Sequence, residues 1–212
     1  MPPEHRKPAL FIGILALLAG ILVALRMSGP HVSTPPEVGG TVFNAPRPLP
    51  EVTLVDQTGA AFAPGQLAGH WSLLFFGFTH CPDVCPTTLT TLAQAVAQLG
   101  DLPPARRPRV YMISVDPGRD DPARMAEYVS YFDPQFVGVT GDPEAVDALA
   151  KGLGVAYAYV PREDGSYSVD HTAAIFVLDP DGSLVALLST PHSATGIARD
   201  FRAITDFLET DS

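Results

Sequence analysis

Both cysteines of the chain lie in one short segment, Cys81-Pro82-Asp83-Val84-Cys85. The segment follows a long apolar run and precedes Thr87–Leu99, whose apolar residues recur at helical spacing. If the segment is itself helical, positions i and i+4 share one face, so both sulfurs can reach one atom. Free amides at a helix start favour the thiolate over the thiol, which predicts a reactive pair.

Three kinds of site fit this spacing. A structural disulfide is disfavoured, because so small a ring constrains little chain entropy. A redox dithiol of the thioredoxin type has two intervening residues rather than three. A metal site is the third kind, in which two thiolates favour Cu(I) or Zn²⁺ and a third ligand is required.

The histidines are the candidates for that third ligand. His171 precedes the apolar run Ala173–Leu178, at a position that faces the cysteine segment in a thioredoxin-like sheet. Spacing alone favours an ordinary polar residue there. His80 adjoins Cys81, but strand alternation directs neighbouring side chains to opposite faces. The other histidines are expected to lie outside any site: His5, His31, His70 and His192.

Four further side chains could contribute to a metal site. Asp83 is either a carboxylate favoured at the helix start or a group near the metal, and we favour the former. Asp116 could line the site, although a turn explains it equally well. Met112 and Met125 fall in a buried strand and a helix, so we expect them in the core.

The remaining pattern predicts an α/β domain with a mixed central sheet flanked by helices. Trp71–Thr79 and Arg109–Val115 are apolar runs typical of strands buried on both faces. Asp121-Pro122 and Asp142-Pro143 each pair an N-cap with a proline at the first helical position, which predicts helices over 122–132 and 143–153. We also expect hairpins of 51–55 with 61–62, 156–160 with 167–169 and 173–178 with 183–188, a strand at 136–140, and a helix over 195–208.

An uncharged apolar run of eighteen residues, Pro8–Leu25, lies near the N-terminus. As a helix it would reach about 27 Å, close to the hydrocarbon thickness of a bilayer. A cleaved signal peptide is the alternative, but Ala24-Leu25-Arg26-Met27 lacks a small-x-small site. Arg6 and Lys7 precede the run, so the positive-inside bias keeps the N-terminus in the cytoplasm.

The predicted organisation therefore has three parts. Residues 1–27 form a cytoplasmic stub and transmembrane anchor, residues 28–48 a Pro/Gly-rich linker, and residues 49–212 the working domain. We expect a single-pass protein of the inner membrane, with its domain on the periplasmic or extracytoplasmic side.

Composition excludes several functions. The whole chain has a net charge of −10, and residues 28–212 alone carry −12, because residues 1–27 are net positive. So acidic a surface repels phosphate backbones, which excludes nucleic-acid binding as a main function. Two cysteines are too few for a disulfide-rich scaffold or a four-thiolate Fe–S cluster. The P-loop, serine-hydrolase and zincin motifs are absent from the sequence.

Three segments together resemble the Sco/SenC family: FTHCPDVCPTTL, SVDPGRDDP at Ser114–Pro122, and VDHTAAIFVLDPDG at Val169–Gly182. The resemblance covers residues 49–209 and implies a membrane-anchored copper protein of thioredoxin-like fold that assists assembly of the CuA centre of cytochrome c oxidase. In the family, two cysteines and a histidine bind copper, and they correspond to Cys81, Cys85 and His171. The implied partner is the oxidase subunit that carries the CuA site, with other copper chaperones or thioredoxin-like reductases as further candidates.

The leading hypothesis is a copper metallochaperone rather than an enzyme with turnover. The alternatives are a thiol–disulfide oxidoreductase that reduces the cysteines of the CuA site, and a redox-sensing or peroxide-reducing thiol protein. One dithiol could serve several roles, because bound copper and a disulfide are alternative states of Cys81 and Cys85. A thioredoxin carries proline directly before the strand near Ala173, whereas this chain has His171-Thr172, which favours metal binding.

The predicted topology can be tested with a fusion. Alkaline phosphatase joined to the C-terminus should be active and should sediment with membranes, because the anchor and the charge bias export residues 28–212. An inactive fusion, or a freely soluble mature protein that begins after residue 25, would contradict the prediction.

Overall fold

The computed structural model describes residues 15–20 and 34–210. Residues 15–20 are helical, and the rest of the expected anchor Pro8–Leu25 lies outside the described residues. Within the described ranges, no helix is both long and apolar enough to cross a membrane. The larger of the chain's two compact units starts at Pro35 and contains the cysteine segment and His171.

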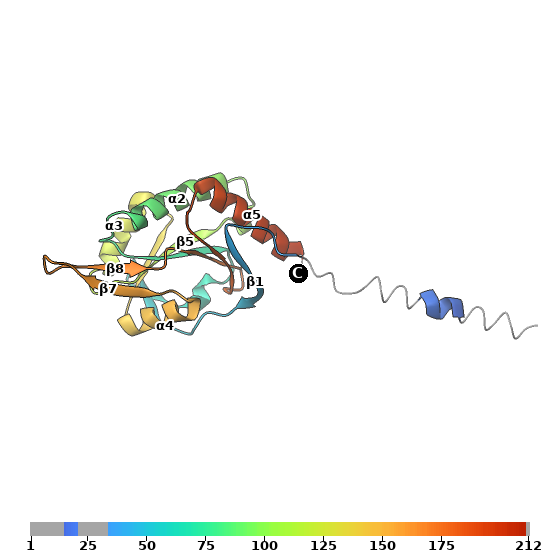
Figure 1. The fold of residues 1–212 in the computed structure, drawn as a ribbon, viewed down its shortest axis with the longest axis horizontal. Coiled ribbons are helices and arrows are strands. Elements are labelled where there is room, and N and C mark those ends of the chain that lie inside the picture. Colours follow the sequence, from blue (N-terminus) through green and yellow to red (C-terminus); the bar gives the residue numbers. More distant parts are fainter. Residues whose placement is uncertain (1–14, 21–33, 211–212) are drawn as a thin grey trace, which may run out of the picture. The chain divides into compact units, whose positions relative to one another are not determined.

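A mixed sheet forms the centre of this unit, as the sequence predicts (Figure 1). Strands β4, β5 and β6 run parallel to one another, and every other pairing in the sheet is antiparallel. In spatial order the strands are β1 (Gly40–Arg47), β10 (Leu184–Leu188), β9 (Ile175–Leu178), β4 (Ser72–Gly77), β5 (Arg109–Ser114), β6 (Val137–Thr140), β2 (Leu54–Asp56) and β3 (Ala61–Phe62).

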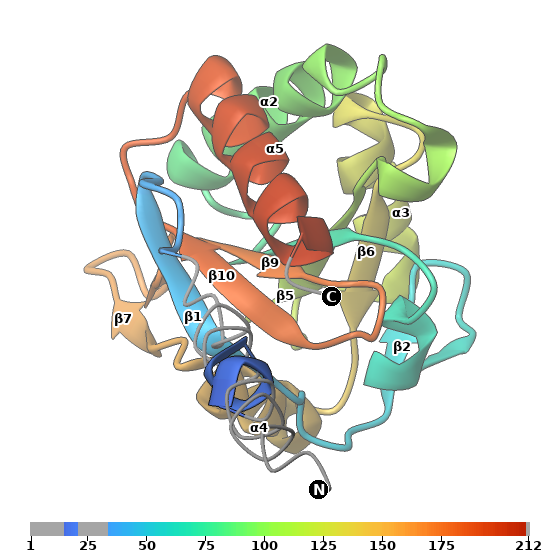
Figure 2. The ribbon, with the colours of Figure 1, turned by 90° about the vertical axis from the view of Figure 1, so that its right-hand side faces the viewer.

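Helices cover both faces of the sheet. Figure 2 shows α2 (Val84–Gln98) beside α5 (Ala194–Thr210), with α3 (Pro122–Phe132) on the same side. The connections from β4 through α2 to β5 and from β5 through α3 to β6 step in the same direction across the sheet, and the right-handedness that parallel crossovers prefer then places both helices on one face. Helix α4 (Pro143–Leu153) lies on the opposite face (Figure 1). Short 3-10 helices occupy Pro64–Leu67 and Pro104–Arg106.

Helices α3 and α4 have the predicted boundaries. The Asp121 carboxylate accepts a hydrogen bond from Arg124 N at 2.7 Å, and Asp142 accepts one from Glu144 N at 2.9 Å. Each aspartate thus satisfies an amide that the first turn leaves free. Gly154 ends α4 with φ of 74°, a left-handed conformation that glycine adopts without strain.

The structure differs from the sequence expectations at the start of α2. The helix begins at Val84 rather than Thr87, so Pro86 lies in the first turn, where a missing N–H has no consequence. Cys81 precedes the helix. The segment is therefore not helical throughout, so the condition for both cysteines to share one helical face is not met, and they lie on either side of a loop–helix junction.

Strand β1 lies entirely within residues 28–48, the segment that we expected to be a linker. Gly40 pairs with Leu188 on β10, and the carboxylate of Asp200 accepts a hydrogen bond from Gly39 N at 2.8 Å. A Cβ on Gly40 would lie 1.9 Å from the Leu187 carbonyl oxygen, so the close pairing requires glycine there. An exposed edge strand of this kind carries little hydrophobic signal.

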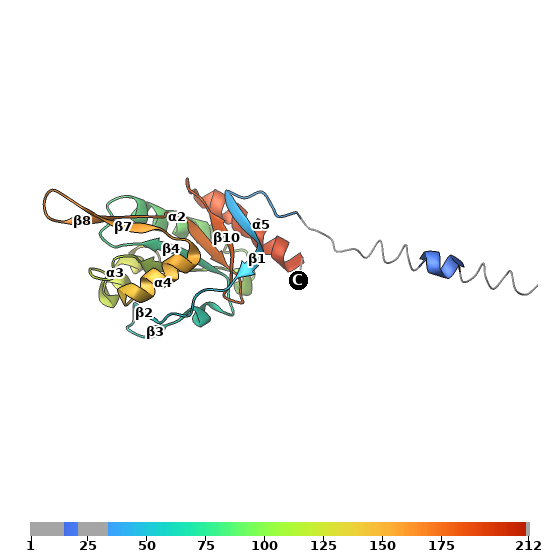
Figure 3. The same cartoon turned by 60° about the horizontal axis from the view of Figure 1, so that its bottom comes forward.

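A separate two-stranded sheet carries one candidate ligand. Strands β7 (Tyr157–Pro161) and β8 (Tyr167–His171) form an antiparallel hairpin in which Tyr157 pairs with His171. The hairpin projects from the body of the unit (Figures 1 and 3). This confirms the predicted hairpin and extends its second strand to His171.

The core surrounds the end of β4 that leads to the cysteines. Phe75 and Phe76 are fully buried, as are Met112 and Met125, in line with the core role predicted for both methionines. Gly77, the last residue of β4, has room for no side chain: an added Cβ would lie 2.9 Å from the Phe75 ring and 3.0 Å from Cys85 Sγ. Gly77 therefore allows α2 to pack Cys85 directly against the strand.

Replacing Gly77 by alanine should lower the free energy of unfolding by about 1–3 kcal/mol, because the new methyl group overpacks a filled site. Urea denaturation of the full-length chain measures the change. Gly65→Ala is the matched control, since no atom lies within 4 Å of its added Cβ and its φ is not in the left-handed region. Equal stabilities of the two variants would show that the contact at Cys85 does not constrain the fold.

Candidate metal centre

The cysteine segment connects β4 with α2. The amide of Cys81 donates to Phe78 O at 3.2 Å, which turns the chain, and Asp83 is the N-cap of α2. Cys85 N, at the helix start, donates to Cys81 Sγ at 3.4 Å. Cys85 is fully buried and Cys81 is partly exposed, and both are free thiols. Only Cys81 therefore faces solvent.

His171 lies next to the buried cysteine. Its Nε2 atom is 3.4 Å from Cys85 Sγ, although 86 residues separate the two in sequence. Its Nδ1 is 3.0 Å from Thr172 O. A carbonyl only accepts, so Nδ1 carries the proton and Nε2 is the nitrogen left for a ligand. Two donors that share one ion at ordinary metal–sulfur and metal–nitrogen lengths lie about 3.6–3.8 Å apart, close to the observed separation.

Two aromatic rings confine the imidazole. Phe75 on β4 and Phe78 just after it make edge-to-face contacts with His171, with ring centroids 5.9 Å and 6.0 Å apart. Such contacts restrict ring rotation without competing for the nitrogen atoms. They hold Nε2 toward Cys85.

A cavity of about 320 Å³ opens beside these residues. Cys81 and His171 line it from opposite elements, and Cys85 lies beneath them. Its wall also includes Phe78, Pro82, Asp83 and Asp170. Small ions and thiol reagents thus have access to Cys81 and His171.

The two cysteines have opposite acidities. The Cys85 thiol donates to the Cys81 sulfur and, with smaller contributions from the amides of Cys85 and Asp83, lowers the pKa of Cys81 to about 3 despite partial burial. The same proton-sharing contact raises the pKa of Cys85 well above its ordinary value, and burial raises it further. Cys81 is the thiolate of the pair and Cys85 is the protonated thiol.

The other histidines lie elsewhere. His80 Nδ1 faces Thr79 Oγ1 at 3.1 Å and the Asp120 carboxylate at 3.8 Å, so its ring is directed into the neighbouring polar network. His70 contacts Tyr111 OH, and His192 donates to Ala173 O. His5 and His31 lie outside the described residues.

The two aspartates considered as site residues have different surroundings. Asp83 is exposed, lies at the cavity and makes no side-chain cap bond. Asp116 is buried and not among the residues of the cavity wall. Its carboxylate accepts hydrogen bonds from Tyr167 OH and Arg119 Nε.

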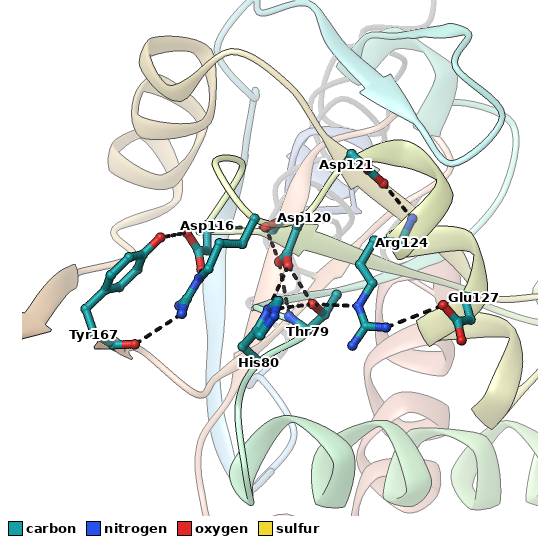
Figure 4. A network of polar contacts seen from close by, with 10 residues as sticks. Thr79, His80, Asp116, Asp120, Asp121, Arg124, Glu127 and Tyr167 are labelled. Atoms are coloured by element: carbon teal, nitrogen blue, oxygen red, sulfur yellow. Dashed lines mark hydrogen bonds and ion pairs between the residues drawn. The ribbon is translucent and has the colours of Figure 1, made fainter. Parts of the chain in front are cut away.

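Sequence reasoning missed three residues of a polar network near the site, and Figure 4 labels two of them, Asp120 and Tyr167. Asp120 is fully buried under the cysteine segment. Arg119, on the loop after β5, donates to the backbone oxygen of Tyr167, the first residue of β8. The signal available was the segment SVDPGRDDP, in which only Asp116 stood out as a possible site residue.

The described residues include no group of three or more histidine, cysteine, aspartate or glutamate side chains arranged to hold one ion. The Cys85–His171 pair is preformed, and Cys81 lies across the cavity mouth on a loop. A third bond would need a small adjustment of that loop.

The sheet order, the helices on its two faces and the thiol–imidazole cavity define an α/β protein of thioredoxin-like fold. The sequence model described as SCO1/SenC matches residues 45–206. The chain belongs to the SCO1/SenC family.

Individual relatives agree with this assignment. A Stutzerimonas stutzeri protein that is described as copper-binding is 38% identical to this chain over 162 residues. The match covers 76% of this chain and 78% of that protein. The mitochondrial SCO2 homolog of Mus musculus is 39% identical over 72% of this chain, but the match spans only 60% of the mouse protein. The structure of Arabidopsis thaliana ScoI with copper bound has a TM-score of 0.70 and 31% identity, covering 74% of this chain and 98% of that one.

The acidity of Cys81 predicts a distinctive alkylation profile. A free thiol with a pKa of about 8.5 is only ~0.3% thiolate at pH 6, and its reaction rate rises about tenfold per pH unit. Cys81 should instead react with iodoacetamide at a nearly constant rate from about pH 5 to about pH 8, because it is already ionised. Mass spectrometry identifies the modified cysteine.

Cys85→Ala provides the control, because an alanine side chain cannot donate a hydrogen bond to the Cys81 sulfur. It removes the largest cause of the shift, so the pKa of Cys81 should rise and its rate at low pH should fall. A wild-type rate that climbs tenfold per pH unit would contradict the proton-sharing contact.

Proposed function

We propose that the protein is a copper metallochaperone for assembly of the CuA centre of cytochrome c oxidase, and that Cys81, Cys85 and His171 hold the copper. The observation that carries this proposal is the 3.4 Å approach of His171 Nε2 to Cys85 Sγ at a cavity that Cys81 also lines. In this role copper is cargo.

The donor set fits copper in both oxidation states. Two soft thiolates suit Cu(I), and the imidazole completes a Cys2His set that can also hold Cu(II). Zn²⁺ accepts the same donors, but we identify no general base that would make the site a zinc hydrolase. Because Cys85 is protonated in the free protein, copper binding must displace its proton, so uptake is coupled to proton release.

Relatives support the copper assignment, since solved structures of Arabidopsis thaliana ScoI, Bradyrhizobium japonicum ScoI and yeast Sco1 have copper bound. The partner that we propose is the oxidase subunit carrying the CuA site. We further propose that residues 1–27 anchor the protein in the inner membrane and that residues 49–212 act on its extracytoplasmic side.

A second candidate function is thiol–disulfide exchange, which the asymmetry of the cysteines favours. The Cys81 thiolate would attack a target disulfide to give a mixed disulfide and one released target thiolate. Cys85, after losing its proton, would then attack Cys81 Sγ. The target would leave as a dithiol, and its two electrons would come from oxidation of Cys81 and Cys85 to a disulfide.

Replacing His171 by alanine separates the two functions. Cu(I) is satisfied by two thiolates, whereas Cu(II) needs the harder imidazole. The variant should lose at least about tenfold in Cu(II) affinity while keeping part of its Cu(I) affinity. Cys81→Ser and Cys85→Ser should weaken both. Titration against a competing chelator measures Cu(I), and the thiolate charge-transfer absorption follows Cu(II).

His80→Ala is the matched control, because His80 adjoins Cys81 but is directed at Thr79 and Asp120. It should leave the Cu(II) spectrum unchanged. If His171→Ala kept wild-type Cu(II) spectra, His171 would not be a ligand. If copper also bound weakly to the wild type, the oxidoreductase function would be the better assignment.

A further inference from the structure

The turn between β5 and α3, residues 115–121, touches both segments that carry the proposed ligands (Figure 4). One of its carboxylates binds the chain just before Cys81, and another binds the first residue of the strand that ends at His171. The two ligand-bearing segments are remote in sequence, and this turn connects them.

The first contact is made by Asp120. Its carboxylate is fully buried and accepts hydrogen bonds from Thr79 N at 3.1 Å, Thr79 Oγ1 at 2.6 Å and Ser114 Oγ at 2.6 Å. A buried carboxylate requires such partners, so Thr79 is held firmly. Thr79 is two residues from Cys81, and the contact fixes where the cysteine loop leaves the sheet.

The second contact is made by Asp116 and Arg119. Asp116 is 1% exposed and accepts from Tyr167 OH at 2.9 Å and from Arg119 Nε. Arg119 also donates to Tyr167 O at 3.2 Å, and its guanidinium carbon lies 3.8 Å from the centroid of the Tyr167 ring. One arginine therefore contacts both the backbone and the side chain of Tyr167.

The two contacts are tied together within one turn. Asp116 O accepts from both Arg119 N and Asp120 N, each at 3.0 Å. The hairpin needs such an attachment, because β7 and β8 pair with each other and, among the described strands, with no strand of the central sheet. Tyr159 OH, which donates to Val115 O at 3.0 Å, adds a third contact to the same turn.

We propose that this turn sets the distance between Cys85 Sγ and His171 Nε2, with Asp116, Arg119 and Asp120 as positioning residues for copper. The inference rests on the proposed copper function. It assigns the spacing of the proposed copper ligands to residues that do not themselves bind copper. Loosening the Tyr167 contacts frees the histidine but leaves the cysteines in place. Loosening Asp120 displaces the cysteine loop itself.

Arg119→Lys tests the hairpin attachment in the full-length chain. Lysine keeps a positive charge beside Asp116 but lacks the planar fork by which Arg119 donates to Asp116 from Nε and to Tyr167 O from a terminal nitrogen. Cu(II) affinity should fall about tenfold, the usual effect of losing a group that orients a metal ligand, while Cu(I) affinity stays within about twofold. Tyr167→Phe, which removes only the hydroxyl bond to Asp116, should act in the same direction.

A measurement without copper accompanies the titrations. In the metal-free protein, backbone amides of residues 169–172 should exchange with deuterium faster in Arg119→Lys than in the wild type, because the hairpin is less firmly held. Tyr157→Phe is the control: Tyr157 lies on the same hairpin, but the structure gives its hydroxyl no hydrogen bond among the described residues. It should change neither copper affinity nor exchange.

Asp120→Asn tests the other contact and should weaken Cu(I) and Cu(II) alike. The proposal fails if Arg119→Lys leaves both Cu(II) affinity and hairpin exchange at wild-type values, or if it weakens Cu(I) and Cu(II) equally. Failure of the copper function itself looks different, since wild type would then bind copper weakly and His171→Ala would change nothing.

Discussion

The carboxylate of Asp120 is buried in the interior, and the nearest basic group among the described residues is His80 Nδ1 at 3.8 Å. Its hydrogen bonds to Thr79 and Ser114 join the ends of the two parallel strands β4 and β5. The next residue, Asp121, turns outward and caps α3. A buried carboxylate is costly unless it is fully hydrogen-bonded. The ends of β4 and β5, the start of α3 and the cysteine loop must therefore take up positions that satisfy all of these hydrogen bonds at once.

Much of the fold could be predicted from the sequence, since its signals are local. The Asp-Pro pairs fixed the starts of α3 and α4, and apolar runs marked β4 and β5. Strand β1 could not be found in this way, because its stability comes from pairing with β10, about 140 residues away, and its side chains are mostly exposed. Family resemblance indicated His171 as a ligand, but the roles of Arg119 and Tyr167 depend on a contact across 48 residues that no spacing rule reveals.

The site combines a rigid part with an accessible part. Cys85 is packed against Gly77 in the core, and His171, which is half-buried at the cavity, is held by the rings of Phe75 and Phe78. Cys81 lies on a loop at the cavity and carries the negative charge of the pair. Under the proposed function, an incoming ion or disulfide meets the charged, accessible sulfur of Cys81 first, and Cys85 and His171 provide fixed positions behind it. Transfer of an ion or of electrons between two proteins requires one group that the partner can reach and others that stay in a fixed position.

The hairpin of β7 and β8 also has a thermodynamic consequence. A two-stranded ribbon is marginally stable by itself, so the fraction of molecules with His171 docked depends on a few side-chain contacts. A ligand that requires the docked form binds with an apparent dissociation constant equal to the intrinsic one divided by that fraction. Under the proposed function, two chains with the same three ligands differ in apparent copper affinity when they differ in the residues that fasten the ribbon.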